Sequence, residues 1–308
     1  MLMHIVLLSL GLALLTAGAE FLVRGAISLA NRFGMPPLLI GLTVVGFGTS
    51  MPELLVSLKA ALAGAPALAV GNVVGSNTAN ILLILGAAAI ISPIAARIPN
   101  LTRDLVMMLV AALTMLGLGY LGNVTPLLGG AMVVVLVAYL AWIASVKSGA
   151  SCADEAELHT RLAGWKEAAF IIGGLAGLFI GASLLIDSAT AIARQFGISE
   201  AVIGLTIVAI GTSLPELATS VVAAIRGHAE VALGNVVGSN IFNILGILGV
   251  TAMVAPVPVD ASMANFDIPV MLAVSLALFA LILIAGRIGR GAGLAMLAAY
   301  TGYVAWLY

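Results

Sequence analysis

The sequence predicts an all-α membrane protein of ten transmembrane helices, arranged as two inverted five-helix repeats with interrupted helices at the membrane midplane. Three observations support this fold class: an apolar composition, apolar runs that are long enough to span a bilayer, and a polar motif that occurs twice. Of the 308 residues, 62% are hydrophobic and 8% are charged, whereas soluble domains contain about 25% charged residues. A chain of this composition is expected to lie in a lipid bilayer.

Ten apolar runs, separated by glycine, proline and charged residues, define the predicted helices. A helix needs about 20 apolar residues to cross about 30 Å of hydrocarbon. The first run continues past Glu20 without a small-residue cleavage site, so we expect a spanning helix and not a removed signal peptide. The predicted helices are 3–31, 36–62, 67–91, 103–121, 125–146, 166–195, 200–225, 229–254, 266–285 and 290–307.

The polar segment 147–165 separates the fifth predicted helix from the sixth. It divides the chain into a first five-helix repeat, 1–146, and a second, 166–308. Five crossings is an odd number, so the second repeat enters the membrane from the opposite side to the first. The two repeats are therefore expected to be inverted.

The distribution of Lys and Arg predicts the orientation, because short cytoplasmic loops carry an excess of positive charge. With the amino terminus outside, ten basic residues lie near the cytoplasmic side, and only Lys59 and Arg194 lie outside. We expect a multi-pass protein of the plasma (inner) membrane, with both termini outside and the linker 147–165 in the cytoplasm. The net charge of −1 gives no reason to expect a nucleic-acid partner, and no obligatory protein partner is evident.

Segments 41–86 and 204–249 are near copies of one another. They align without a gap at an offset of 163 residues, and 28 of 46 positions are identical, mostly Gly, Ser, Thr, Asn, Pro and Glu. Helices with a purely structural role would conserve apolar character and not this polar set. Each copy places one glutamate, Glu53 or Glu216, inside an apolar run, and an ionisable residue within a membrane indicates a functional site.

The first part of each copy reads G-T-S-x-P-E, at 48–53 and 211–216. Proline removes a backbone hydrogen bond and clashes with the preceding turn, so we expect both helices to be interrupted and the carbonyls around Gly46 and Ala209 to be freed. Irregular backbone persists at membrane depth only where it faces protein or a polar cavity. An inverted repeat with interrupted helices is typical of a transporter with a site at the midplane.

The second part of each copy, G-N-V-V-G-S-N, adds amide and hydroxyl groups. Ser76 and Asn80 are four residues apart, as are Ser239 and Asn243, so each pair lies on one helix face and both pairs can point at one site. The glycines at 71, 75, 234 and 238 also match a helix-packing pattern.

The combined ligand set contains only carboxylate, amide, hydroxyl and backbone oxygens, which suits a hard cation such as Ca²⁺ or Na⁺. No thiol or imidazole accompanies them, which argues against softer transition metals. The single cysteine, Cys152, excludes an intramolecular disulfide. Two ionised glutamates give the site a charge of about −2, which one Ca²⁺ neutralises and three Na⁺ overcompensate.

These motifs identify a resemblance: the chain is similar to the sodium/calcium exchangers of the cation/calcium exchanger superfamily, especially their compact prokaryotic members. The paired motifs are long and specific, and the ten-helix architecture covers almost the whole chain. The resemblance implies that Glu53 and Glu216 are shared cation ligands. It further implies ligands at Thr49, Ser50, Thr212 and Ser213 (hydroxyl or carbonyl), at Ser76 and Ser239 (flanking Na⁺ sites), and at the carbonyls of Gly46 and Ala209.

One position departs from a well-known form of the family pattern. Some exchangers, including the potassium-dependent branch, carry aspartate where this chain has Asn243, so the two repeats here present the symmetric amides Asn80 and Asn243. The departure lowers the expected charge, disfavours potassium co-transport and leaves the ion stoichiometry open.

The resulting hypothesis is a secondary antiporter, and not an enzyme, that takes in Na⁺ and expels Ca²⁺ by alternating access. The exchange of three Na⁺ for one Ca²⁺, which the resemblance implies, would move net charge. Na⁺ and Ca²⁺ are its transported substrates, and no cofactor is expected. An H⁺-coupled cation antiporter and a passive cation channel remain alternatives. An intramembrane hydrolase is disfavoured, because the sequence offers no suitable Ser and His pair or metal triad.

Overall fold

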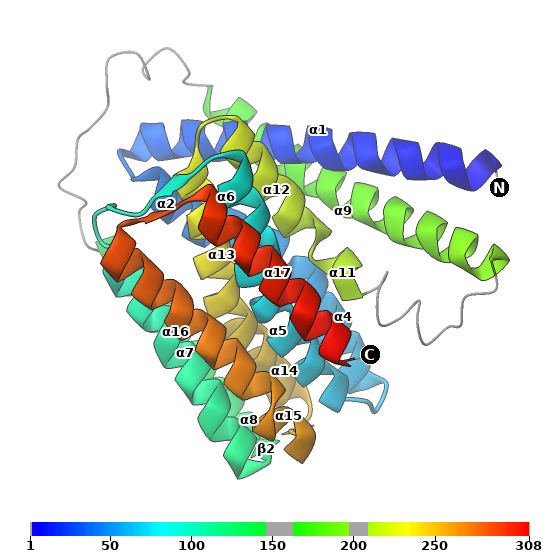
Figure 1. Ribbon diagram of the computed structural model, residues 1–308, viewed down its shortest axis with the longest axis vertical. Coiled ribbons are helices and arrows are strands. Elements are labelled where there is room, and N and C mark those ends of the chain that lie inside the picture. Colours follow the sequence, from blue (N-terminus) through cyan, green and yellow to red (C-terminus); the bar gives the residue numbers. More distant parts are fainter. Residues whose placement is uncertain (1, 146–162, 197–208, 308) are drawn as a thin grey trace.

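The computed structural model describes residues 2–145, 163–196 and 209–307 (Figure 1). Within these residues, eight helical spans are long and apolar enough to cross a membrane. They are Met3–Phe33, Pro37–Leu62, Ala67–Ile91, Leu101–Leu121, Pro126–Ser145, Gly164–Gln195, Ala229–Val254 and Ala261–Ala285. The prediction of a helical membrane protein is therefore confirmed.

Several predicted ranges contain one long helix each. These helices are α1 (Leu2–Phe33), α7 (Leu101–Leu121), α8 (Pro126–Ser145), α9 (Gly164–Gln195) and α17 (Arg290–Leu307), while α15 (Ala261–Asn265) and α16 (Asp267–Ala285) share another range. The predicted helix 200–225 begins outside the described residues, and its described part contains α11 (Ala209–Thr212) and α12 (Leu214–Ile225). Most of the predicted linker 147–165 also lies outside them.

Three of the four ranges that carry the repeated motif are divided into shorter helical pieces that include π-helical segments. The first contains α2 (Pro37–Ile40), η1 (Gly41–Val45), α3 (Gly46–Thr49) and α4 (Met51–Leu62). The second contains α5 (Ala67–Ala79), η2 (Asn80–Leu85) and α6 (Gly86–Ile91), and the third contains α13 (Ala229–Ile241), η5 (Phe242–Leu248) and α14 (Gly249–Val254). Since π-helical turns often accompany functional sites, these irregularities point to the motif segments.

Two short strand pairs join loops at opposite ends of α7, which the sequence did not predict. Strand β1 (Ile94–Ala95) pairs with β4 (Arg287–Ile288), and β2 (Asn123–Val124) pairs with β3 (Val257–Pro258), both antiparallel. Gly122 (φ 72°) and Gly286 (φ 63°) end α7 and α16 in the left-handed region, which glycine adopts without strain, and the chain enters β2 and β4 directly afterwards. Apart from these strands of two residues each, the described fold is all-α.

Helices α1 and α9 lie side by side and cross the other helices (Figure 1). Glycines make this contact very close. A Cβ on Gly18 would lie 2.7 Å from the carbonyl oxygen of Gly174, and a Cβ on Gly11 would lie 2.9 Å from that of Gly181. The two backbones therefore touch along a glycine seam, formed by Gly11, Gly18, Gly174 and Gly181.

Helix α13 lies at the centre of the protein, packed against α2, η1, α3, α7 and α12, and all its residues except Glu230 are buried. Side chains at Gly234 and Gly238 would collide with the backbone of Leu38 and Leu42, which confirms the predicted packing role for this glycine pair. For Gly75 of the first copy, no described atom lies within 4 Å of the place that a Cβ would occupy, and its packing role stays a prediction.

Candidate cation site

Glu53 and Glu216 each lie in the first turn of a helix, α4 and α12 respectively. Each helix follows a serine whose ψ is close to zero, Ser50 (φ −80°, ψ 4°) and Ser213 (φ −90°, ψ 7°), so the backbone turns there. A proline in the first turn then costs little, because its missing N–H would have no helical partner. The positive end of a helix dipole favours a carboxylate, although both glutamates are only 1% exposed.

Each carboxylate receives a hydrogen bond from the opposite copy of the motif. The Ser50 hydroxyl donates to Oε1 of Glu216 over 3.2 Å, and the Ser213 hydroxyl donates to Oε1 of Glu53 over 3.3 Å. The second oxygen, Oε2, of each glutamate has no hydrogen-bond partner among the described residues. The two motifs are therefore interlocked, and each leaves one buried carboxylate oxygen unsatisfied.

The π-helical segments bring two more unsatisfied oxygens to the same region. Segment η2, which opens with Asn80, packs against α12, and η5, which contains Asn243, packs against α4. Both asparagines are 1% exposed, and the Oδ1 atom of each has no hydrogen-bond partner in the described part of the chain. Each amide is thus carried on a segment that contacts the glutamate helix of the other copy.

Two asparagines that were not among the predicted ligands fasten the glutamate helices to their neighbours. Asn72 donates to the Ser57 hydroxyl (2.9 Å) and to the Glu53 carbonyl (3.0 Å). Asn235 donates to the Ser220 hydroxyl over 3.0 Å in the equivalent arrangement. These bonds join α4 to α5 and α12 to α13. Both copies of G-N-V-V-G-S-N contain this asparagine, so the sequence contained a signal for the residue. It contained none for the serine to which the asparagine donates.

Two further asparagines, Asn77 and Asn240, were also missed as site residues. Asn77 Nδ2 donates to the backbone carbonyl of Asn240 (3.2 Å), and Asn240 Nδ2 donates to that of Asn77 (3.3 Å). Their side-chain oxygens accept bonds from the ligand candidates: Asn80 donates to Asn240 Oδ1 (3.0 Å), and Asn243 donates to Asn77 Oδ1 (2.9 Å). The four amides form one crossed network between the copies.

The predicted hydroxyl residues are all buried in this region. Thr49 donates to Asn235 Oδ1 over 3.1 Å, and its hydroxyl also lies 3.1 Å from the Val45 carbonyl. Ser239 donates to the Gly46 carbonyl over 3.3 Å. The remaining predicted hydroxyls belong to Ser76 and Thr212, which are 6% and 8% exposed.

The expectation of a freed carbonyl at Gly46 is wrong for this conformation. The Gly46 carbonyl accepts the backbone N–H of Ser50 (3.2 Å) as well as the Ser239 hydroxyl. The physical reason is that a proline removes the bond to the residue four positions before it, which for Pro52 is Gly48 and not Gly46. The equivalent Ala209 begins α11, and the residues directly before it lie outside the described ranges.

The site thus combines four buried oxygens that have no partner among the described residues: Oε2 of Glu53 and Glu216, and Oδ1 of Asn80 and Asn243. Buried polar atoms are nearly always hydrogen-bonded, so four orphans of one chemical type need an explanation. All are acceptors, and within the described residues no Lys or Arg forms an ion pair with either glutamate. A hard cation such as Ca²⁺ or Na⁺ is bound by oxygens of this kind.

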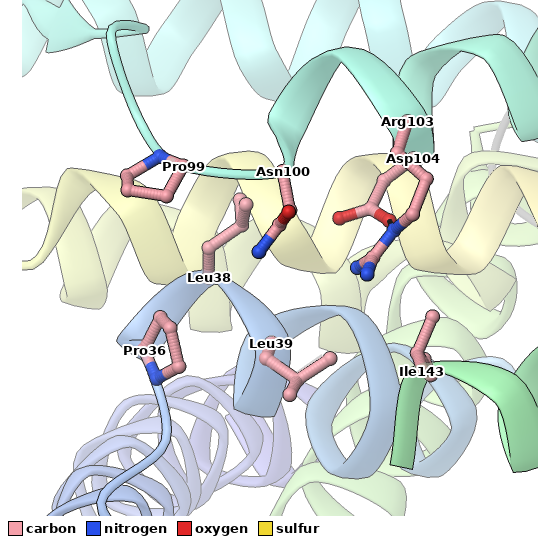
Figure 2. A pocket seen from close by; sticks show the side chains of 8 residues that line it. All are labelled: Pro36, Leu38, Leu39, Pro99, Asn100, Arg103, Asp104 and Ile143. Carbon is pink, nitrogen blue, oxygen red and sulfur yellow. Dashed lines mark hydrogen bonds and ion pairs between the residues drawn. The ribbon is translucent and has the colours of Figure 1, made fainter. Parts of the chain in front are cut away.

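A small pocket elsewhere contains none of the predicted ligands. Figure 2 shows it between the start of α2 and the start of α7, with Asn100, Arg103 and Asp104 on one side and Leu38 and Leu39 on the other. Its buried carboxylate is satisfied: Asp104 accepts bonds from the Tyr139 hydroxyl (2.8 Å) and from Arg103 Nε (2.7 Å).

The second half of the chain repeats this tie, since the Tyr303 hydroxyl donates to Asp267 over 2.8 Å. We therefore interpret the Asp104 cluster as a structural link between α7 and α8, and not as a second ion site.

The fold and the site together define a class: an integral membrane protein of many helices that encloses a buried, oxygen-lined, acidic candidate cation site. The family described as "Sodium/calcium exchanger protein" matches residues 3–144 and 166–308. The chain belongs to this family, whose members are transporters and not enzymes, and it is of the compact prokaryotic type.

Individual relatives match along nearly the whole chain. "Putative antiporter CaxA" of Alkalimonas amylolytica is 40% identical over 314 aligned positions, which cover 98% of each protein. "Inner membrane protein YrbG" of Escherichia coli is 38% identical, with 100% of this chain and 98% of that protein covered. A solved structure of the sodium-calcium exchanger NCX_Mj, soaked with 2.5 mM Na⁺ and 0.1 mM Ca²⁺, matches with a TM-score of 0.86 and 35% identity over 99% of both chains.

Proposed function

We propose that this protein is a secondary antiporter that exchanges Na⁺ for Ca²⁺ by alternating access and extrudes Ca²⁺ with net movement of charge. One observation carries the proposal: four buried oxygens without partners, two of them from carboxylates, contributed equally by the two copies of the motif. One Ca²⁺ balances the two carboxylate charges. The sodium-calcium exchanger NCX_Mj, which has a similar fold, supports the same pair of substrates.

In this proposal Glu53 and Glu216 bind the cations directly and are shared between ions. Asn80 and Asn243 add neutral oxygens beside them, so that the charge of the site stays near −2. The other proposed ligands are Thr49, Ser50, Thr212, Ser213, Ser76 and Ser239, with the carbonyls of Gly46 and Ala209. Because Gly46 already accepts two hydrogen bonds, its role requires a conformation in which at least one of them opens.

The proposed architecture has ten spans in two inverted repeats, 1–146 and 166–308, joined by a cytoplasmic linker at 147–165. The reciprocal bonds of the site support this symmetry, and so do the strand pairs: Ile94 faces Ile288, while Val124 faces Val257. An even number of predicted spans separates the two strands of each pair, so the predicted topology puts paired loops on the same side. We propose an inner-membrane protein with both termini outside.

We further propose that α1 and α9 move together and gate the site. Residues of α9 cover both copies of the G-T-S-x-P-E motif: Leu175 lies against Gly48, and Ile186 lies against Gly211. These two contacts are eleven residues apart on one helix, or about 16 Å along its axis. A displacement of α9, with α1 attached through the glycine seam, would uncover one motif or the other.

Calcium uptake into proteoliposomes tests the proposed function. Vesicles containing the purified protein receive labelled Ca²⁺ under an imposed Na⁺, K⁺ or H⁺ gradient in turn, with the other ions held equal on both sides. We expect uptake only when Na⁺ is loaded inside, and faster uptake when an inside-positive potential accompanies it, if more than two Na⁺ leave for each Ca²⁺. Uptake driven by a pH gradient would favour H⁺ coupling instead, and sustained flux without any counter-ion would indicate a channel.

A further inference from the structure

The crossed amide network determines which atom of each ligand amide points toward the ions. An asparagine side chain has an oxygen and an NH₂ group of nearly the same shape, so its orientation follows from its hydrogen-bond partners. Asn80 and Asn243 could bind a cation only through oxygen. Something must therefore keep the NH₂ group of each of them turned away from the ions.

Asn77 and Asn240 supply that constraint, because their own orientation is fixed by backbone. The side chain of Asn240 lies against the carbonyl of Asn77, which can only accept, so Asn240 must present Nδ2 there and Oδ1 on its other side. Asn80 meets this Oδ1 at 3.0 Å and must offer Nδ2 to it. Its oxygen is the atom left over, and that oxygen has no partner among the described residues.

The same logic holds in the other direction. The backbone carbonyl of Asn240 fixes Asn77 through a bond of 3.2 Å, and Asn77 Oδ1 accepts Nδ2 of Asn243 over 2.9 Å. Asn77, Asn240, Asn80 and Asn243 are all buried, with exposures of 1%. Water therefore does not compete for these bonds, and the orientation is set entirely by protein groups.

We propose that Asn77 and Asn240 are positioning residues that orient the oxygens of Asn243 and Asn80 toward the transported cations, each acting on the ligand of the opposite repeat. This inference rests on the proposed function, since it assumes that cations bind between the two copies. It assigns a role to the last asparagine of G-N-V-V-G-S-N in each copy. That residue touches no cation itself.

Paired substitutions distinguish positioning from simple packing. Asn240→Ala removes the acceptor of Asn80 but keeps the backbone carbonyl that fixes Asn77, so only one ligand amide is released. We expect the half-saturating Ca²⁺ concentration for uptake to rise about tenfold, the size of one favourable contact to a charged group. Asn77→Ala should do the same through Asn243.

Aspartate at the ligand position provides the decisive comparison, because a carboxylate has two equivalent oxygens and needs no orientation. Asn80→Asp alone should impair Ca²⁺ uptake, since its carboxylate faces Asn240 Oδ1. In the double variant N80D/N240A that repulsion disappears, and either carboxylate oxygen can face the ion. In N80D/N77A the repulsion stays, and Asn243 also loses the residue that orients it.

We call a double variant matched when alanine replaces the asparagine that contacts the new aspartate, and mismatched when alanine replaces the other one. Both kinds add one aspartate and remove one asparagine side chain, so these changes cancel in the comparison. We expect the half-saturating Ca²⁺ concentration of N80D/N240A to be about tenfold lower than that of N80D/N77A, and that of N243D/N77A to be lower than that of N243D/N240A. Equal values within each comparison would overturn the positioning role and leave only a packing role.

Folding is checked by size-exclusion chromatography in detergent. If an alanine variant aggregates, serine replaces alanine at Asn77 and Asn240 throughout, and the same comparisons decide the outcome. Wild-type protein without Na⁺-driven uptake would refute the proposed function. Wild-type uptake with equal double variants would refute only this inference.

Discussion

Replacing either buried glutamate with glutamine should stop exchange while the protein stays folded. Glu53→Gln and Glu216→Gln keep the size of the side chain and remove one negative charge from a site that has two. The two carboxylates have matching surroundings, with 1% exposure each and one serine hydroxyl at 3.3 Å or 3.2 Å. The two variants should therefore be impaired to a similar extent.

The size of the effect follows from the charge that is lost. At a separation of about 4 Å and an effective dielectric constant of about 20, one negative charge attracts a divalent cation by roughly 8 kcal/mol. Desolvation offsets part of this attraction, and breaking one buried charge pair costs about 3–5 kcal/mol in measured cases. Because 1.4 kcal/mol corresponds to a factor of ten, Ca²⁺ affinity should fall by about 10²- to 10⁴-fold.

Sodium-driven uptake of labelled Ca²⁺ into proteoliposomes measures the loss, and Ca²⁺ binding in detergent shows whether affinity is its cause. Asp187→Asn serves as the control, because Asp187 is an exposed carboxylate on α9 outside the crossed network. Its neutralisation should leave uptake close to wild type. Wild-type uptake in either glutamine variant would refute the assignment of both glutamates as shared ligands.

Three further predictions concern the groups around the carboxylates and the helix packing. Ser213→Ala removes the hydroxyl that donates to Glu53 Oε1 and should raise the half-saturating Ca²⁺ concentration about three- to tenfold. Complete loss of uptake would show that the contribution of Ser213 is larger than one hydrogen bond. Gly174→Ala inserts a methyl group 2.8 Å from the carbonyl oxygen of Gly18 and should lower the free energy of unfolding by about 1–3 kcal/mol. Gly173→Ala is the control, because no described atom lies within 4 Å of its added methyl group. Equal melting temperatures of the two variants in detergent would contradict the glycine seam. Asn235→Leu removes the side-chain amide that donates to the buried Ser220 hydroxyl and so links α13 to α12. It should lower the free energy of unfolding by about 1–3 kcal/mol, and an unchanged melting temperature in detergent would contradict a stabilising role for this bond.

The sequence predicted those features that depend on local periodicity and on the chemistry of single residues. The helical ranges followed from runs of apolar residues, and the buried positions of Glu53 and Glu216 followed from their place inside such runs. Asn80 and Asn243 are both buried on segments that contact a glutamate helix, and their role as ligands stays a prediction. Their grouping into one candidate site could be predicted because the motif occurs twice.

Contacts between the two copies could not be predicted in the same way. Asn77 and Asn240 stand next to predicted ligands in the sequence, but the bonds that give them a role cross a separation of 160 residues or more. Helical spacing shows which residues share a face and does not show which neighbour that face meets. The sequence also contained no local signal for the π-helical segments that carry Asn80 and Asn243. The expectation of a free carbonyl at Gly46 was wrong because it assigned the effect of Pro52 to the wrong residue.

The two strand pairs make the two halves of the chain depend on one another. Each pair takes one strand from each half of the chain, β1 with β4 at one end of α7 and β2 with β3 at the other. Neither half can close either pair alone, and unpaired strand edges invite association with another chain. A half expressed by itself would therefore leave two strand edges open, which the other half covers here.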